Sequence, residues 1–295
     1  MRIRPQNNPL FRPPAEASSL ILQVDIGCQY NRCDFCGMYT HVAHRARSLP
    51  EILDLIRVET RRCPDANRVF LADADAMRLP TDDLLAILHE LARCLPKLAR
   101  VNSYANGHSI LAKSPVELDR LRMARLNTLY MGLESGDEEI LRVMHKADTA
   151  EAMIRAGRLA QDHGLKMSVM VLLGLAGVDR SQTHAKATAE ALNRMQPRLL
   201  SVLRAIPVPG TKYHAAIAAG RSRELTEWEA VRELRDMVSR LSLAGTVFRA
   251  NHASNIVALE GRLPRDQTAL IAELDHLLAS NALDRASPGP PPLWL

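Results

Sequence analysis

The chain has 295 residues, of which 47% are hydrophobic, so it has enough apolar side chains for a sizeable globular core. The net charge is only +5 and aromatic residues make up only 4%, and no basic block interleaved with aromatic residues indicates a nucleic-acid groove. No apolar run reaches the roughly 18 residues of a membrane span, and the polar N-terminal stretch lacks the core of a signal peptide. We therefore expect a cytoplasmic protein with reduced thiols and with neither membrane nor DNA as a partner.

From residue 20 onward, short apolar runs rich in β-branched residues alternate with amphipathic helical stretches. This alternation is typical of a parallel α/β architecture. The helices have clear start and stop signals: Ser114 and Glu117 predict a capping box, and Gly164 predicts a helix end. The predicted strands are residues 20–26, 68–72, 100–104, 128–133, 166–173 and 199–205.

Six βα units without a GxGxxG turn after the first strand predict an α/β fold of the partial TIM barrel type, (β/α)6, with a short C-terminal extension. Residues 245–250 are expected to add an edge strand, and residues 264–280 another helix. We expect an N-terminal extension over residues 1–17, a barrel domain over 18–260, and a C-terminal helix with a Pro-rich tail over 261–295. The tail is predicted to be disordered or loosely docked.

Three of the five cysteines, Cys28, Cys33 and Cys36, lie within nine residues directly after the first predicted strand. Functional groups of parallel barrels collect at the C-terminal ends of the strands. A cytoplasmic protein with such a cluster is expected to hold a metal or redox site rather than a disulfide framework.

Several interpretations of the triplet are open. A ferredoxin-type [2Fe–2S] site would need Cys63 as its fourth ligand, but Cys63 falls at the end of a predicted helix. Structural zinc would add His41 or His44, although such sites usually staple domains that lack a core. Unconnected thiols are disfavoured by the close spacing. A [4Fe–4S] cluster with three protein ligands leaves one iron open to the amino and carboxylate groups of S-adenosylmethionine (SAM).

The segment CQYNRCDFC resembles the cluster-binding motif of the radical SAM superfamily, although its first gap is one residue longer than the commonest C-x₃-C-x₂-C spacing. The resemblance extends over about residues 18–260. It implies a [4Fe–4S] cluster held by Cys28, Cys33 and Cys36, SAM as the second cofactor, and Phe35 packed near the adenine. It also implies reductive cleavage of SAM to a 5′-deoxyadenosyl radical that abstracts hydrogen from a substrate.

Four further segments are similar to superfamily motifs at successive predicted strand ends. FLADADAM stands where relatives contact the methionyl amino group, which implies Asp73 and Asp75. YMGLESG resembles the GxESG segment of the methylthiotransferase-like and oxygen-independent coproporphyrinogen-oxidase-like branches, which implies Glu134 and Ser135. VLLGLAG matches the glycine segment beside the adenine, which implies Gly174, and IPVPGTKYH resembles a PxPGTxxY turn. Each segment alone also fits an ordinary turn or helix cap.

The segment NHASN, residues 251–255, is similar to segments of unassigned bacterial members of the superfamily. It fits either a surface loop with a capping histidine or a lid in which His252 and Asn255 contact the substrate. Cys63 and Cys94 fall on predicted helices, so we expect no second cluster. The resemblance implies an external one-electron donor of the flavodoxin or ferredoxin type. A small-molecule substrate is favoured over RNA, and the alternative class is a non-catalytic iron–sulfur or zinc protein.

Overall fold

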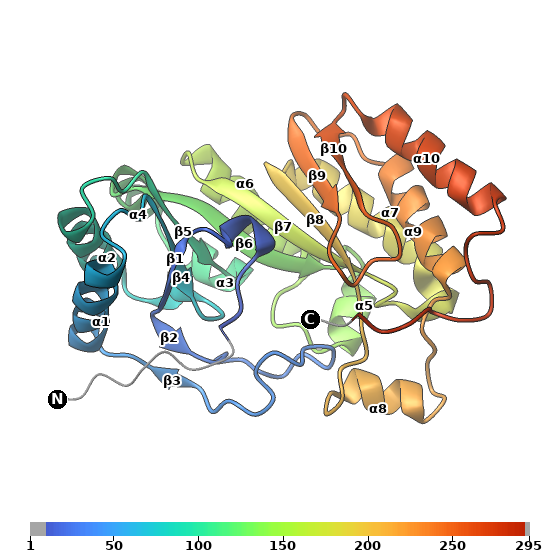
Figure 1. Ribbon diagram of the computed structural model, residues 1–295, viewed down its shortest axis with the longest axis horizontal. Coiled ribbons are helices and arrows are strands. Elements are labelled where there is room, and N and C mark those ends of the chain that lie inside the picture. The colour runs from blue at the N-terminus through green and yellow to red at the C-terminus, as the bar shows by residue number, and fades with distance from the viewer. Residues whose placement is uncertain (1–9, 293–295) are drawn as a thin grey trace. The chain divides into compact units, whose positions relative to one another are not determined.

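The structure is a computed structural model that describes residues 10–292, and these residues form two compact units (Figure 1). The first unit contains the chain up to Asn31, Met38–Met131 and Ala156–Met167. The second contains Arg32–Gly37, Gly132–Arg155 and the chain from Ser168 onward. Each unit therefore carries part of the cysteine segment.

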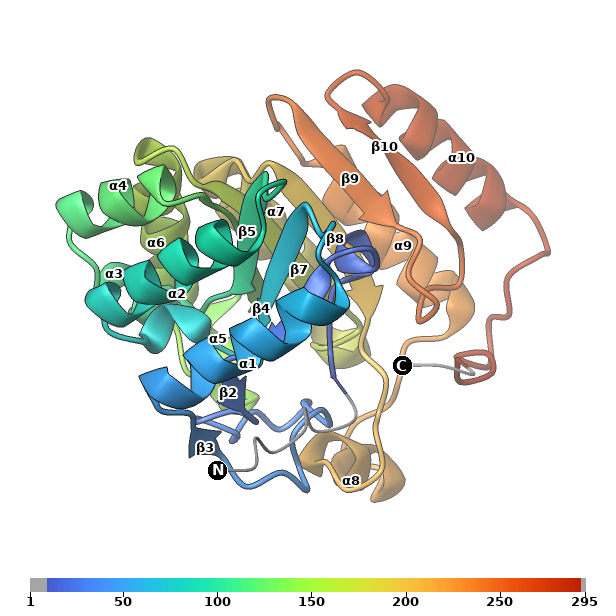
Figure 2. The same cartoon turned by 60° about the vertical axis from the view of Figure 1, so that its left-hand side comes forward.

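The main-sheet strands that begin in the first unit are parallel. β1 (Leu20–Gln23) pairs with β4 (Arg68–Ala72), β4 with β5 (Arg100–Tyr104), and β5 with β6 (Leu126–Glu134). The helices α1 (Leu49–Arg62) and α2 (Thr81–Cys94) pack side by side (Figure 2). The shorter elements are η1 (Pro14–Glu16), η2 (Ala76–Arg78), α3 (Gly107–Leu111) and α4 (Pro115–Met123), and α6 (Ala150–Asp162) begins in the second unit and ends in the first.

Local capping explains where two of these helices begin. Ser48 and Glu51 form a capping box at α1, and Ser114 and Glu117 form the predicted one at α4. The core of this unit is built on the rings of Phe70, Tyr104 and Tyr130, which meet edge to face with centroid distances of 4.9 to 6.4 Å.

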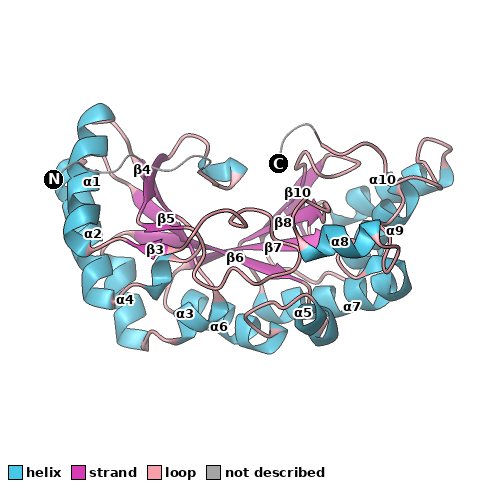
Figure 3. Ribbon diagram, turned by 90° about the horizontal axis from the view of Figure 1, so that it is seen from below, coloured by secondary structure: helices cyan, strands magenta, loops and turns pink. Residues whose placement is uncertain are grey.

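In the second unit, β7 (Lys166–Leu173), β8 (Leu199–Arg204) and β9 (Thr246–Ala250) are parallel, and β10 (Leu259–Leu263) is antiparallel to β9. The helices α7 (Gly177–Met195), α9 (Glu227–Ser239) and α10 (Gln267–Ala279) pack on one another along this part of the sheet (Figure 3). The short helices are α5 (Glu138–Val143) and α8 (Lys212–Ala218).

The main sheet has eight strands in the order β1-β4-β5-β6-β7-β8-β9-β10, so the predicted mostly parallel α/β fold is confirmed. Two details of the prediction are wrong. β9 is not an edge strand, because β10 pairs outside it, and the charges of Glu260 and Arg262 had hidden β10 in the sequence. The first predicted strand also divides, since Asp25–Ile26 (β2) leaves β1 to pair with β3 (Arg45–Ala46).

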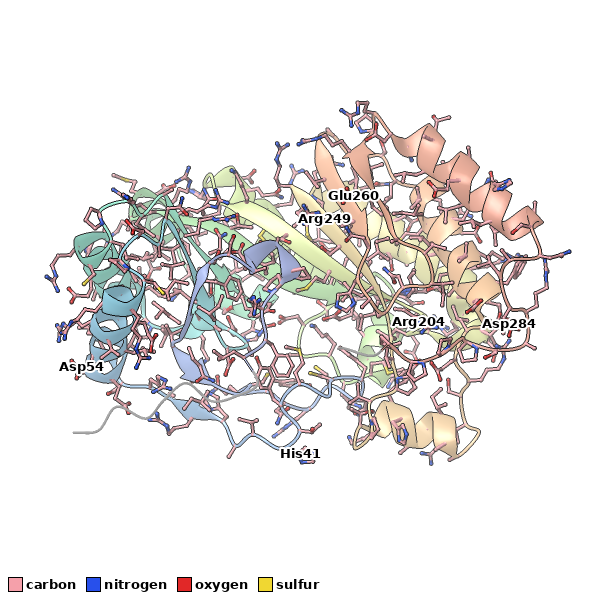
Figure 4. The ribbon with its side chains drawn as sticks, viewed as in Figure 1. His41, Asp54, Arg204, Arg249, Glu260 and Asp284 are labelled. Atoms are coloured by element: carbon pink, nitrogen blue, oxygen red, sulfur yellow. The ribbon has the colours of Figure 1, made fainter. Side chains whose placement is uncertain are left out.

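The segment after α10 is hydrogen-bonded to the rest of the second unit as far as Pro288. The backbone amide of Asp284 donates to the Glu227 carboxylate at 2.9 Å, and the amide of Glu227 donates to the carbonyl of Ser287 at 3.0 Å. Arg204, which lies at the end of β8 and is labelled in Figure 4, donates to the carbonyl of Pro288. These bonds hold the tail to the start of α9 and the end of β8, and residues 293–295 lie outside the described part.

Candidate functional site

The cysteine segment begins in the first unit, in the loop between β2 and β3. Gly27 has a φ of +77°, which favours glycine, and a Cβ at this position would lie 3.2 Å from Cγ1 of Val42. The amide of Asn31 donates to Sγ of Cys28 at 3.4 Å, and its side chain donates to the carbonyl of Tyr39 at 2.9 Å. Asn31 thus links the turn that carries Cys28 to a later turn of the same loop, at Tyr39.

Asp73 anchors the start of this loop from the end of β4. Its side chain is buried, and its Oδ2 accepts from the amide of Gly27 at 2.9 Å and from Gln23 at 2.8 Å. Its Oδ1 accepts from the hydroxyl of Tyr39 at 3.3 Å. Burial raises the pKa of Asp73, and these three hydrogen bonds oppose the shift.

Asp75 is buried as well, but it serves another element of the same unit. Its carboxylate accepts from the hydroxyl of Ser109 at 2.8 Å and from the side-chain amide of Asn106 at 3.1 Å. Both donors lie at the first turn of α3, so Asp75 holds the start of that helix. Burial raises the pKa of this carboxyl too.

The second unit holds Cys33 and Cys36 through Asp34, the first of the two residues between them. The amide of Asp34 donates to the carbonyl of Met144 at 3.0 Å, and its carbonyl accepts from the amide of Tyr213 at 2.9 Å. Its carboxylate lies 3.0 Å from Nδ1 of His145 and 3.1 Å from Nζ of Lys212. The segment is therefore fixed from two sides, by the chain after α5 and by the start of α8.

Packing completes this attachment. Phe35 packs against a buried apolar cluster that includes Leu175 and Tyr213. Gly37 passes so close to Val208 that a Cβ on the glycine would lie 2.5 Å from Cγ1 of the valine. Phe35 and Gly37 thus both pack against residues of the PxPGTxxY turn, which spans residues 206–214.

The end of β6 carries an ion pair that the sequence did not reveal. Glu134 has a φ of +61°, and its Oε1 accepts from Nζ of Lys146 at 3.0 Å. The two side chains are only 13% and 9% exposed. Burial alone would lower the pKa of Lys146, but Glu134 and Cys33 together raise it. A Cβ on Gly132 would lie 1.9 Å from Oε1 of Glu134, so the motif glycine leaves room for this carboxylate.

Ser135 and Gly174 lie in the interior of the second unit, which also contains Glu134 and Lys146. The side chain of Ser135 is fully buried, and its hydroxyl lies 2.8 Å from Nδ1 of His184. Gly174 has a φ of +78°, and its amide donates to the Glu233 carboxylate at 2.7 Å. The sequence did not suggest a role for His184 or Glu233, because each is a polar residue within a helical stretch that contains many others. Only the structure shows that both are buried.

His252 and Asn255 belong to a turn between β9 and β10. Nδ1 of His252 accepts from the amide of Ser254 at 3.1 Å, and burial lowers the pKa of this imidazole. The side-chain amide of Asn255 donates to the carbonyls of Val202 and Ala250 at 2.7 and 2.9 Å. These polar groups close the turn onto the ends of β8 and β9.

The sequence of the chain matches the model of a known protein family. The family model of the radical SAM superfamily matches residues 26–185, which is more than half of the chain. The chain belongs to the radical SAM superfamily. The resemblance inferred from the motifs is thereby confirmed, and members of this superfamily are enzymes that bind a [4Fe–4S] cluster and SAM.

Individual relatives of this radical SAM protein are distant. An uncharacterised protein of Methanopyrus kandleri is 27% identical over 195 residues, which are 61% of this chain and 36% of that protein. The chain thus spans about a third of the length of this curated relative.

Two solved radical SAM structures share the fold. Coproporphyrinogen III oxidase (HemN) of Escherichia coli is 16% identical with a TM-score of 0.56, over 75% of this chain and 51% of that one. The radical SAM methyltransferase TsrM of Kitasatospora setae, solved with cobalamin and a [4Fe–4S] cluster, is 18% identical with a TM-score of 0.55, over 68% of this chain and 39% of that one.

The thiols of this radical SAM protein fit an iron–sulfur cluster chemically. Cys28, Cys33 and Cys36 are all half-buried and outside any disulfide, and thiolates are the usual ligands of such clusters. Cys28 belongs to the first unit and the other two to the second. Within residues 10–292, no three His, Cys, Asp or Glu side chains are already grouped as a metal site. Cys63 follows the last residue of α1, and Cys94 ends α2.

Radical SAM enzymes typically draw on an external electron donor. None of the helices in the described part of this radical SAM chain is long and apolar enough to cross a membrane.

Proposed function

We propose that Cys28, Cys33 and Cys36 hold three irons of a [4Fe–4S] cluster and that SAM occupies the fourth. When bound, this pair supplies a 5′-deoxyadenosyl radical, because one electron from the cluster breaks a carbon–sulfur bond of SAM and releases methionine. The reaction of the whole enzyme is hydrogen abstraction from a small-molecule substrate. The cysteine triplet within a radical SAM family match carries the proposal.

The protein's own contribution is to hold the cysteine segment before the cofactors arrive. Asp73 fixes Gly27, the residue before Cys28, from the end of β4. Asp34 fixes the turn between Cys33 and Cys36, with four polar contacts between 2.9 and 3.1 Å. Ligands that are oriented in advance lose less entropy when the metal binds.

We place the charged methionine end of SAM beside Glu134 and Lys146. The carboxylate of Glu134 complements the ammonium group of SAM, and the ammonium of Lys146 complements its carboxylate. The electrostatic interaction of Lys146 with Cys33 supports this placement, because it puts the pair near a cluster ligand. Phe35, packed against Leu175, and the glycine turn at Gly174 are our candidates for the adenine side.

For His252 and Asn255 we propose that the structural role comes first. Both side chains of this turn are hydrogen-bonded within the second unit, which supports the capping interpretation of the NHASN segment. Asp75 has the same kind of role at α3. The electron donor that we propose is a flavodoxin or a ferredoxin, as in the sequence-based expectation.

The decisive experiment is anaerobic reconstitution followed by iron and sulfide analysis and by incubation with SAM and dithionite. We expect close to four irons and four sulfides per chain, as a [4Fe–4S] cluster requires, and 5′-deoxyadenosine by mass spectrometry. Replacing Cys28, Cys33 or Cys36 with alanine should abolish the cluster, while Cys63→Ala, the matched control, should keep it. Stoichiometric zinc in iron-replete preparations, or loss of the cluster in Cys63→Ala, would overturn the assignment.

A further inference from the structure

A buried network of polar side chains links two loops of the second unit. The hydroxyl of Ser135 lies 2.8 Å from Nδ1 of His184, and Nε2 of His184 lies 3.7 Å from Oε1 of Glu233. The same carboxylate oxygen accepts from the amide of Gly174 at 2.7 Å. The side chains of His184 and Glu233 are 1% and 0% exposed, and they come from α7 and α9.

Core packing does not explain this polar network. Burying an imidazole and a carboxyl is costly, and well-packed apolar residues of similar volume are often as stable or more stable. Nucleophilic chemistry does not explain it either, although serine, histidine and glutamate suggest a triad. The side chain of Ser135 is fully buried, so no substrate reaches its hydroxyl.

The two ends of the polar network, at Ser135 and Glu233, show what it does. At one end, Oγ of Ser135 also accepts from the amide of Asp137 at 2.9 Å, which closes the turn after β6. The amide of Gly136, which lies between Ser135 and Asp137, donates to the hydroxyl of Thr188 at 2.9 Å. A Cβ on Gly136 would lie 2.2 Å from the carbonyl oxygen of Ala187, so this turn is pressed directly onto α7.

At the other end, Glu233 holds the turn after β7. Besides the amide of Gly174, it accepts a hydrogen bond from the hydroxyl of Ser181. Gly174 and Gly177 both have positive φ, so the turn depends on backbone conformations that few other residues adopt. Burial raises the pKa of Glu233, while His184 opposes the shift.

We propose that His184 and Glu233 are positioning residues for SAM: together they set the turns after β6 and β7, on which Glu134 and Gly174 are presented. This inference rests on the proposed function, because it assumes that these two turns contact SAM. Neither side chain touches the cofactor in this scheme. Their effect is to keep two separate loops in one arrangement, so that SAM binding does not have to order them.

Four variants test the proposal in the full-length chain. Glu233→Leu removes the acceptor for Gly174, whereas Glu233→Gln keeps an oxygen there and serves as the conservative rescue. His184→Asn shortens the side chain but keeps a group near the position of Nδ1, beside Ser135. Glu190→Gln, on the exposed face of α7 with 63% side-chain exposure, is the matched control.

Two readouts separate positioning from general stability. Hydrogen–deuterium exchange of the protein without cofactors should quicken at residues 135–137 and 174–177 in Glu233→Leu, but not in α10. The dissociation constant for SAM, measured by calorimetry on the reconstituted protein, should rise roughly tenfold, as expected for one lost hydrogen bond. Iron content should match the wild type, and the effects of Glu233→Gln and His184→Asn should be smaller.

The proposal is overturned if the exchange at both turns is unchanged, or if it quickens while the SAM dissociation constant stays that of the wild type. An equal effect of Glu190→Gln would overturn it too. If Glu233→Leu does not fold, His184→Asn decides by the same criteria. Failure of the proposed function has another signature, since Glu134→Ala would then leave SAM binding unchanged whatever the exchange data show.

Discussion

Lys146→Met is the substitution whose outcome follows most directly from the structure. It removes the ammonium group that lies 3.0 Å from Oε1 of Glu134 and leaves that carboxylate, only 13% exposed, without its partner. Breaking a buried pair from one side costs about 3–5 kcal/mol, and the lower end applies here because both side chains keep some contact with water. A loss of about 3 kcal/mol lowers Tm by roughly 6–12 °C.

The pH dependence and a double variant sharpen this test. Because the pKa of Lys146 is raised, its stabilising effect is fully present at neutral pH and is lost only as the pH rises through the folded-state value. The double variant with Glu134→Leu should recover most of the stability, because an apolar pair carries no unpaired charge.

Thermal unfolding followed by circular dichroism is the appropriate assay, with and without SAM. SAM should raise the Tm of the reconstituted wild type and should stabilise neither the Lys146 variant nor the double variant, since both lack the proposed contact. The reasoning is refuted if Lys146→Met unfolds within about a degree of the wild type, or if the double variant is no more stable than the single one.

Other predictions concern the supports of the site. Gly37→Ala should lower the iron retained after reconstitution, because its Cβ would lie 2.5 Å from Cγ1 of Val208. Adding Val208→Ala should restore the iron only in part, because Cβ of residue 208 would still lie 2.9 Å from the new methyl group. Burial raises the pKa of Asp75, so the folded state binds the proton of this carboxyl more tightly than the unfolded state does. The free energy of unfolding should therefore fall as the pH rises above about 4. Asp75→Asn should reduce this pH dependence, as measured by urea titrations at several pH values. Asn255→Ala breaks bonds to two carbonyls and should cost about 1–3 kcal/mol in the same titrations, with unchanged iron content; reduced iron would contradict a purely local role.

Much of the architecture could be predicted because its signals are local. The strands 68–72, 100–104 and 166–173 were predicted with the bounds that the structure has, since buried parallel strands appear as continuous apolar runs between helix caps. The capping box at Ser114 is confirmed for the same reason: its two partners lie three residues apart. The cysteine triplet is likewise local, and its spacing already indicated the family that the comparison confirmed.

What the sequence did not reveal depends on contacts between distant segments. β10 was missed because its pairing with β9 decides its conformation, and its alternating charges resemble those of a loop. Lys146 is one of six lysines in the sequence, and only the fold of the chain after α5 brings it to Glu134. His184 and Glu233 lie 49 residues apart, and each resembles an ordinary helix residue in the sequence. Only when α7 and α9 pack together do their side chains share one buried space, because burial and pairing of polar groups belong to the packed chain rather than to any single segment.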